Sequence, residues 1–149
     1  MVVLEYKIKG KPSQYKAINE AIRTVQFVCN KCLRYWMDSS GDAKIDPFAL
    51  NKLSTQLRQE FPFVKSLNSM AVQAAAEREW LAISRFYDSC KSKKSGKKRY
   101  PRFQKDNRSV EYKTSGWSLH KSKRRLTITD KKGIGELKLL GKWDIHSYQ

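Results

Sequence analysis

The spacing of apolar residues changes near residue 91, and this change constrains the fold more than any other feature of the chain. Before it, apolar residues recur every three or four positions in the segments 14–37, 47–61 and 69–90. After it, apolar and polar residues alternate in short runs. A period of 3.6 indicates helices with one buried face, and a period of 2 indicates half-buried strands. The sequence therefore predicts a helical block followed by a sheet.

The three predicted helices carry apolar stripes and recognisable boundaries. Asp46 is a good N-cap, and Pro47 suits the first position of the second helix, which Pro62 ends. The sequence Ser39-Ser40-Gly41 ends the first helix. The stripes consist of Ile18, Ile22, Val25, Cys29, Cys32, Leu33 and Trp36, then Leu50, Leu53 and Leu57, then Val72, Ala76, Trp80, Ile83 and Tyr87.

One predicted strand precedes the helices and several follow them. Residues 2–9 alternate, so that Tyr6 and Ile8 share one face and Lys7 and Lys9 the other. The later strands are expected at 110–114, 126–128 and 137–139. Grouped helices and strands are typical of an α+β fold. We expect a small antiparallel β-barrel or sheet, built from the first strand and the C-terminal strands, with a three-helix insertion.

This order divides the chain into three parts. Residues 1–12 hold the first strand of the β domain, residues 13–91 form the helical insertion, and residues 92–149 hold a basic linker and the remaining strands. The last residues show no terminating helix or cap, so we expect the chain to be part of a longer protein.

Positive charge is concentrated in the C-terminal part of the chain. Residues 91–142 contain 18 Lys and Arg residues against 4 Asp and Glu residues, a net charge of +14 out of +17 for the whole chain. Like charges repel one another and destabilise a compact state, so a polyanion is the expected partner. The aromatic residues Tyr100, Phe103, Tyr112 and Trp117 lie among these charges, which favours single-stranded nucleic acid or RNA.

Composition also narrows the cellular setting. A membrane surface is the weaker alternative to nucleic acid, because no apolar run approaches the ~20 residues needed to span a bilayer. The N-terminus lacks the apolar segment of a signal peptide. The odd number of cysteines, three, fits a reducing cytoplasm better than a disulfide framework.

Four segments, in order, resemble the N-terminal part of TnpB (OrfB), a family of RNA-guided DNA nucleases encoded by prokaryotic insertion sequences. They are V-L-E-Y-K-I-K, Q-F-V-C-N-K-C-L-R-Y-W, S-M-A-V-Q-A-A-A-E-R-E-W-L-A-I-S-R-F-Y and Y-P-R-F-Q-K. Two positions depart from the family pattern: Gln26 replaces an Arg, and the basic residue expected after P-R-F is displaced to Lys105.

The resemblance implies wedge and recognition regions that surround a guide RNA and target DNA. The family's RuvC-like nuclease domain and zinc ribbon would follow this region and are absent from the chain. The resemblance therefore implies recognition without catalysis, no cofactor, a possible partner RuvC-like domain, and a cytoplasmic, nucleoid-associated protein of a prokaryote.

Charge and resemblance together select the candidate nucleic-acid contacts. Lys97, Lys98, Arg99, Arg102 and Lys105 are the best phosphate contacts, although a basic linker without fixed contacts would have the same composition. Tyr100 and Phe103 flank Pro101, and we expect Phe103 to be buried as an anchor of this stretch. The other candidates are Lys7, Lys9, Asn30, Arg34, Gln73, Arg78, Arg85 and Lys113.

Several residues allow a purely structural interpretation. Asn30 lies in an apolar helix, where its amide either reads a base edge or satisfies internal polar groups. Cys29 and Cys32 lack a second ligand pair, so packing is favoured over zinc binding. Packing is also favoured for Trp36 and Trp80.

Two other functions fit the same sequence. One is a stand-alone DNA-binding regulator of the helix-turn-helix type, which would bind a duplex operator without RNA. The other is an inert decay product of an insertion sequence, since a truncated frame keeps every motif.

Overall fold

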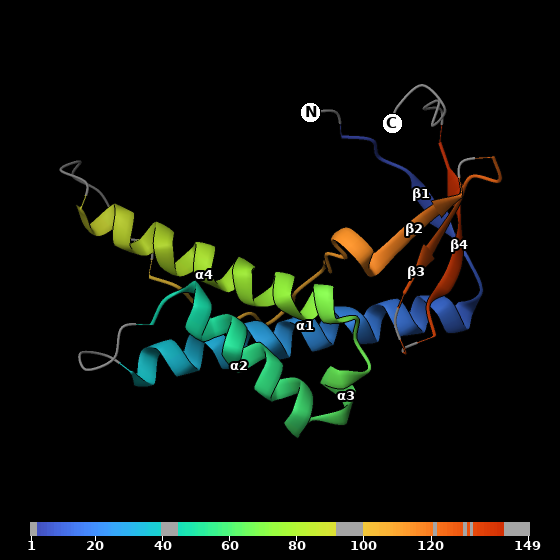
Figure 1. The fold of residues 1–149 in the computed structure, drawn as a ribbon. Coiled ribbons are helices and arrows are strands. Elements are labelled where there is room, and N and C mark those ends of the chain that lie inside the picture. The colour runs from blue at the N-terminus through green and yellow to red at the C-terminus, as the bar shows by residue number, and fades with distance from the viewer. Residues whose placement is uncertain are drawn as a thin grey trace.

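The computed structural model describes residues 3–39, 45–91, 100–120, 122–129, 131 and 133–141. The helices pack as one group, and the sheet lies against the first part of α1 (Figure 1). The predicted α+β fold is confirmed. In chain order the elements are β1 (Lys7–Lys9), α1 (Pro12–Asp38), α2 (Pro47–Glu60), α3 (Pro62–Lys65), α4 (Ser69–Lys91), the 3-10 turn η1 (Thr114–Gly116), β2 (Trp117–His120), β3 (Arg125–Ile128) and β4 (Gly135–Leu140).

Local capping chemistry sets the ends of the helices. The side chain of Asp46 accepts a hydrogen bond from the N–H of Ala49 at 2.8 Å, so α2 begins where the sequence predicted. Pro12 opens α1, because its missing N–H costs nothing at the first helical position. Asn68 precedes α4 and accepts a hydrogen bond from the N–H of Met70 at 2.8 Å. The predicted helices therefore exist with nearly the predicted bounds.

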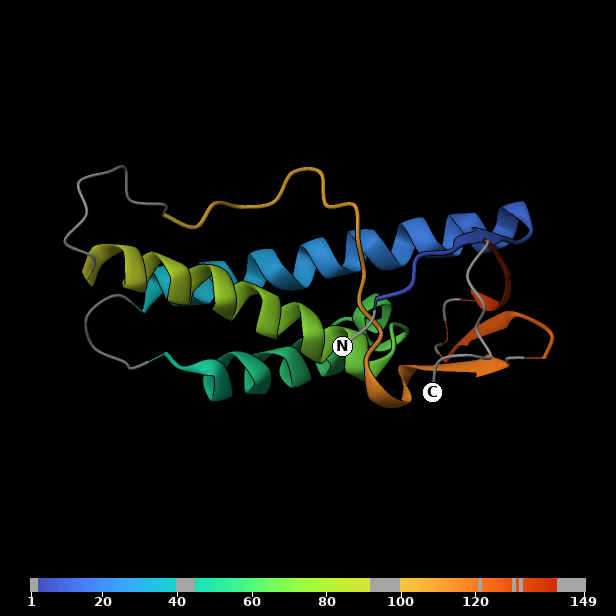
Figure 2. The ribbon, with the colours of Figure 1, turned by 90° about the horizontal axis from the view of Figure 1, so that it is seen from above.

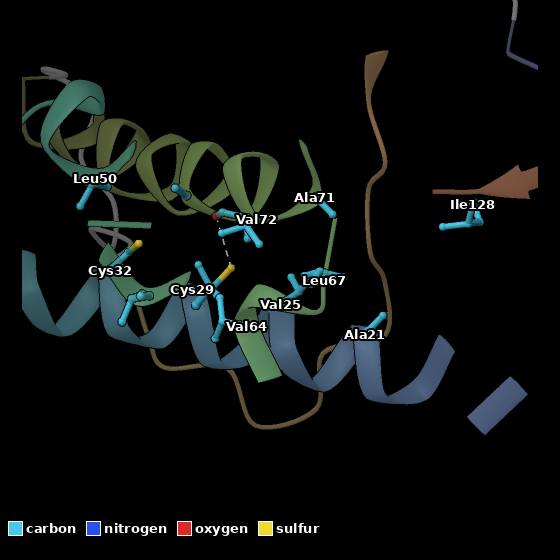
Figure 3. Close-up of a cluster of buried hydrophobic side chains, with 14 of the residues drawn as sticks. Ala21, Val25, Cys29, Cys32, Leu50, Val64, Leu67, Ala71, Val72 and Ile128 are labelled. Atoms are coloured by element: carbon cyan, nitrogen blue, oxygen red, sulfur yellow. Dashed lines mark hydrogen bonds between the residues drawn. The ribbon is translucent and has the colours of Figure 1, made fainter. Parts of the chain in front are cut away.

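The apolar stripes of α1, α2 and α4 meet in one core (Figure 3). Val25 and Cys29 of α1, Leu50 of α2 and Val72 of α4 are almost completely buried. The short helix α3 adds Val64. Full burial of a side chain of the size of Val or Leu stabilises a fold by ~1.5–3 kcal/mol. Trp36 and Trp80 pack against this core, as predicted.

The sheet has the strand order β1-β4-β3-β2, and all its pairs are antiparallel. The pairing of β1 with β4, in which Ile8 faces Leu139, confirms that the first strand joins the C-terminal strands. The sheet is open, so of the two expected forms, barrel and sheet, the sheet is correct. The side chain of Gln14 fastens it to α1 by donating to the carbonyl oxygens of Ile134 and Glu136 at 2.5 and 2.8 Å.

The two faces of the sheet differ in chemistry. One face is apolar and borders an open groove of about 540 Å³, which Ile18 of α1 also lines. The same groove is lined by Tyr6 and by the strand residues Ile8, Trp117, Leu119, Leu126, Ile128, Leu137 and Leu139. The other face, described below, is polar and basic.

The predicted strand at 110–114 is wrong. Residues 110–113 are outside the strands, and η1 begins at Thr114. The strand that pairs with β3 is β2, with Trp117 opposite Ile128. Val110 and Tyr112 alternate inward toward the groove, which produces a strand-like pattern in a segment without strand pairing.

Candidate nucleic-acid interface

Residues 100–113, named here the crossing segment, run beside α1 and then pass over α4 (Figure 2). The amide of Asn30 holds the backbone of Gln104 in both directions. Its Nδ2 donates to the Gln104 carbonyl oxygen at 3.0 Å, and its Oδ1 accepts from the Gln104 N–H at 2.8 Å. Of the two interpretations of Asn30, these bonds favour the internal one, because both polar groups of the amide are engaged.

Two further attachments fix the crossing segment. Asn107 donates its Nδ2 to the Ile22 carbonyl oxygen at 2.9 Å and its N–H to Oε1 of Gln26 at 3.0 Å. Lys113 forms an ion pair with Glu77 of α4 at 2.6 Å. Side chains, in place of a strand ladder, hold this extended backbone in position.

The start of the crossing segment is anchored by Tyr100 and Pro101. The Tyr100 ring lies 5.6 Å from the ring of Trp36 and 4.9 Å from that of Phe86, and Pro101 is buried. The Phe103 side chain is 42% exposed, so the prediction that it is buried is wrong. Pro101 and the backbone of Gln104 make the inward contacts, which leaves Phe103 at the surface.

Six exposed cations gather where the crossing segment follows α1. We name them the α1 surface: Arg23, Lys31, Arg34, Arg102, Lys105 and Arg108. On α1 itself, Arg23, Lys31 and Arg34 line a groove of about 400 Å³ together with Gln26, Phe27 and Asn30. The exposed rings of Tyr35, Tyr100 and Phe103 belong to the same two stretches of chain. Cations and rings on one surface can neutralise phosphates and stack on bases.

Acidic side chains neutralise part of the α1 surface. Asp38 pairs with Arg34 at 3.2 Å. Asp106 pairs with Arg108 at 3.0 Å and with Arg23 at 3.5 Å. The hydrogen bond from Arg108, reinforced by its charge and by Arg23, lowers the pKa of the Asp106 carboxyl below its ordinary value.

A second group of basic residues, four cations and His120, lies on the polar face of the sheet. Lys9 faces Lys138, Lys138 faces Arg125, and Arg125 faces His120, so the four form a row across all four strands. Lys7 lies two residues from Lys9 on the same face. We name these five residues the sheet surface. Glu136 pairs with Arg125 at 3.2 Å and neutralises one of them.

The structure separates the predicted site residues into groups. The first group lies where the crossing segment follows α1 and consists of Asn30, Arg34, Tyr100, Arg102, Phe103 and Lys105. Lys7 and Lys9 belong to the sheet surface. Arg78 donates to Asn107 at 3.3 Å and Lys113 binds Glu77, while Gln73 is half-buried and Arg85 is exposed on α4. Lys97, Lys98 and Arg99 lie outside the described residues.

The sequence-based prediction missed cations on both surfaces. On α1, the missed Arg23 and Lys31 recur at helical spacing with the predicted Arg34, opposite the apolar stripe, a signal that the sequence carries. On the sheet, Arg125 and Lys138 become neighbours only through the strand register.

The two cysteines of the C-x-x-C sequence are free and buried, as predicted. Burial, followed by the nearby Glu79 carboxylate, raises the pKa of the Cys29 thiol to about 12. Burial also raises the pKa of Cys32 to about 12. Both thiols are therefore protonated at neutral pH and act as packing groups.

No family model matches the chain, and no curated protein sequence matches it. The resemblance to TnpB therefore remains a hypothesis. Within the described part of the chain, none of the helices has the length and apolarity needed to cross a membrane.

Proposed function

We propose that this chain binds nucleic acid, as the part of a TnpB-like RNA-guided nuclease that recognises guide RNA and target DNA. The α1 surface is the observation that supports this proposal most strongly. It collects six exposed cations from two separate stretches of chain, and the same stretches carry exposed aromatic rings.

The physical reason to expect a polyanionic partner is the electrostatic repulsion among these cations. A folded chain that gathers like charges on one surface is destabilised by their repulsion. A phosphate backbone removes that repulsion, and the release of its counterions favours the complex further. The adjacent rings favour unpaired bases, and hence single-stranded segments or RNA loops, over a plain acidic protein.

The proposal assigns recognition, and not cleavage, to this chain. Three of the described acidic residues have structural partners: Asp46 caps α2, Asp38 pairs with Arg34, and Asp106 pairs with two arginines. Cleavage would belong to a RuvC-like partner domain, and we assign no cofactor to this chain. The proposal includes a cytoplasmic, nucleoid-associated location in a prokaryote.

Fluorescence anisotropy with a single-stranded RNA, a structured RNA and a duplex DNA tests the proposal. The variant Arg23→Gln/Lys31→Gln/Arg34→Gln should lose affinity for RNA by about 10–100-fold and flatten the salt slope by about 2 units. The control Lys11→Gln/Lys52→Gln/Lys65→Gln removes the same charge from exposed positions outside the α1 surface.

Equal losses in the two variants would show that net charge alone drives binding, and would contradict the proposed surface. Tight binding to duplex DNA with no binding to either RNA would favour the stand-alone DNA-binding regulator instead.

A further inference from the structure

We propose that Arg23 and Arg108 form a binding site for one backbone phosphate, and that Asp106 occupies this site in the free protein. The inference rests on the proposed function and identifies a specific phosphate subsite within the α1 surface. It also assigns to Asp106 a role that limits affinity.

Two guanidinium groups from different elements converge on one carboxylate. Arg108, on the crossing segment, directs Nε and Nη2 at Oδ2 of Asp106 at 3.1 and 3.0 Å. Arg23, on α1, directs Nη2 at Oδ1 at 3.5 Å. Carboxylates and phosphates both accept two hydrogen bonds from an arginine fork. The Asp106 oxygens therefore mark positions that phosphate oxygens can take.

The site is open to a ligand. The side chains of Arg23, Asp106 and Arg108 are 54, 61 and 85% exposed. Ion pairs this exposed contribute little to stability, so an incoming phosphate can displace the carboxylate readily.

Other contacts keep Arg23 and the backbone beside Arg108 in place when Asp106 leaves. Nη1 of Arg23 donates to Oε1 of Gln26 at 3.2 Å, and the same oxygen accepts the N–H of Asn107 at 3.0 Å. Asn107 is also fastened to the carbonyl oxygen of Ile22. The crossing segment therefore stays attached to α1 at this point without Asp106.

The site continues into the groove on α1. Arg23 contacts Asp106 and also lines the groove that contains Lys31 and Arg34. A phosphate bound by Arg23 and Arg108 would be followed along α1 by cations that can bind further phosphates of the same strand. The subsite thus forms one end of a phosphate path.

Substitution of Asp106 tests the inference by a gain of affinity. Asp106→Asn keeps the shape of the side chain and frees both arginines. It should bind a labelled single-stranded uridine oligonucleotide about 3–10-fold more tightly and steepen the salt slope by about 0.7–0.9, the value for one further phosphate contact. The control Asp88→Asn removes the same charge from an exposed position on α4 and should change affinity less than about 2-fold.

A triple variant separates the site from the general effect of charge. Adding Arg23→Gln and Arg108→Gln to Asp106→Asn should abolish the gain. The inference is overturned if Asp106→Asn binds no more tightly than Asp88→Asn, or if its gain persists without the two arginines. If the unmodified chain fails to bind the oligonucleotide at low salt, the proposed function fails as well; normal binding without the gain refutes the phosphate site alone.

Discussion

One half-buried polar side chain, Asn30, fixes the position of the crossing segment on α1. Asn30 satisfies both backbone groups of Gln104, and no apolar residue at this position could do so. Glu79 is a polar group in the interior, 3% exposed and close enough to Cys29 to raise the pKa of the thiol. At this scale the two residues have opposite effects, because a satisfied amide stabilises the fold whereas a buried carboxylate opposes it when charged.

Asn30→Ala should destabilise the protein by ~1–3 kcal/mol, because it leaves the N–H and carbonyl oxygen of Gln104 without their partner. Urea unfolding measures the loss, and hydrogen exchange should show faster exchange at the Gln104 amide. Asn19→Ala, at an exposed position on the same helix, is the control. Equal stability of the two variants would contradict the role given to Asn30.

Glu79→Gln should make stability less dependent on pH. Burial raises the pKa of Glu79 from 4.5 to about 7, so the folded state favours the protonated carboxyl. This contribution is fully present below pH 4.5 and is lost as the pH rises through about 7. The variant should exceed the unmodified protein in stability at pH 8 by about 1–3 kcal/mol, and the difference should shrink toward pH 5.

Urea unfolding at several pH values gives the difference between the two proteins. A constant difference across this range would mean that Glu79 does not titrate as its burial requires. The control is Glu60→Gln, which changes an exposed carboxylate of α2. Glu77→Gln is unsuitable as a control because Glu77 pairs with Lys113.

At the scale of elements, the strand register brings like charges together at the expense of stability. Lys138 of β4 lies between Lys9 of β1 and Arg125 of β3. Like charges directly opposite each other in a sheet are destabilising. A sheet selected for stability alone would alternate the charges, as Glu136 does next to Arg125. The row therefore fits the proposed contact with a polyanion.

Lys138→Gln should raise stability by ~0.2–1 kcal/mol and weaken RNA binding at the same time. Thermal unfolding and anisotropy give the two quantities. Lys65→Gln, on α3, removes a charge outside both surfaces and serves as the control. Unchanged RNA affinity would show that the sheet surface is not a binding surface. A loss of stability would show that Lys138 is not repelled by its neighbours.

At the scale of the whole molecule, the net charge of +17 makes stability and binding respond oppositely to salt. Screening weakens repulsion within the fold and also weakens attraction to phosphates. The free energy of unfolding in urea should rise between 50 and 500 mM NaCl, over which the Debye length falls from ~14 to ~4 Å, while RNA affinity falls. A decrease in both would indicate that attractive ion pairs outweigh repulsion in this chain.

Local patterns predicted the helices and part of the sheet correctly. The start of α2 after Asp46 and the start of α4 at Ser69 follow from capping and periodicity, which involve residues close in sequence. The strand at 117–120 was missed because residues 110–114 alternate equally well. Pairing with β3, and not alternation, distinguishes the two segments. The prediction that Phe103 is buried was wrong for a related reason. Pro101 and the backbone of Gln104 make the inward contacts that were expected of Phe103.

The sequence by itself determined the helical block, the presence of strands before and after it, and the excess of positive charge. These depend on periodicity, composition and local chemistry. Only the tertiary structure decided which cations share a surface. Arg23 meets Arg108 because Asn30 and Asn107 fasten the crossing segment to α1, and Lys9 meets Lys138 because of one strand register. Contacts between residues this far apart in the chain depend on packing geometry, which no local pattern encodes.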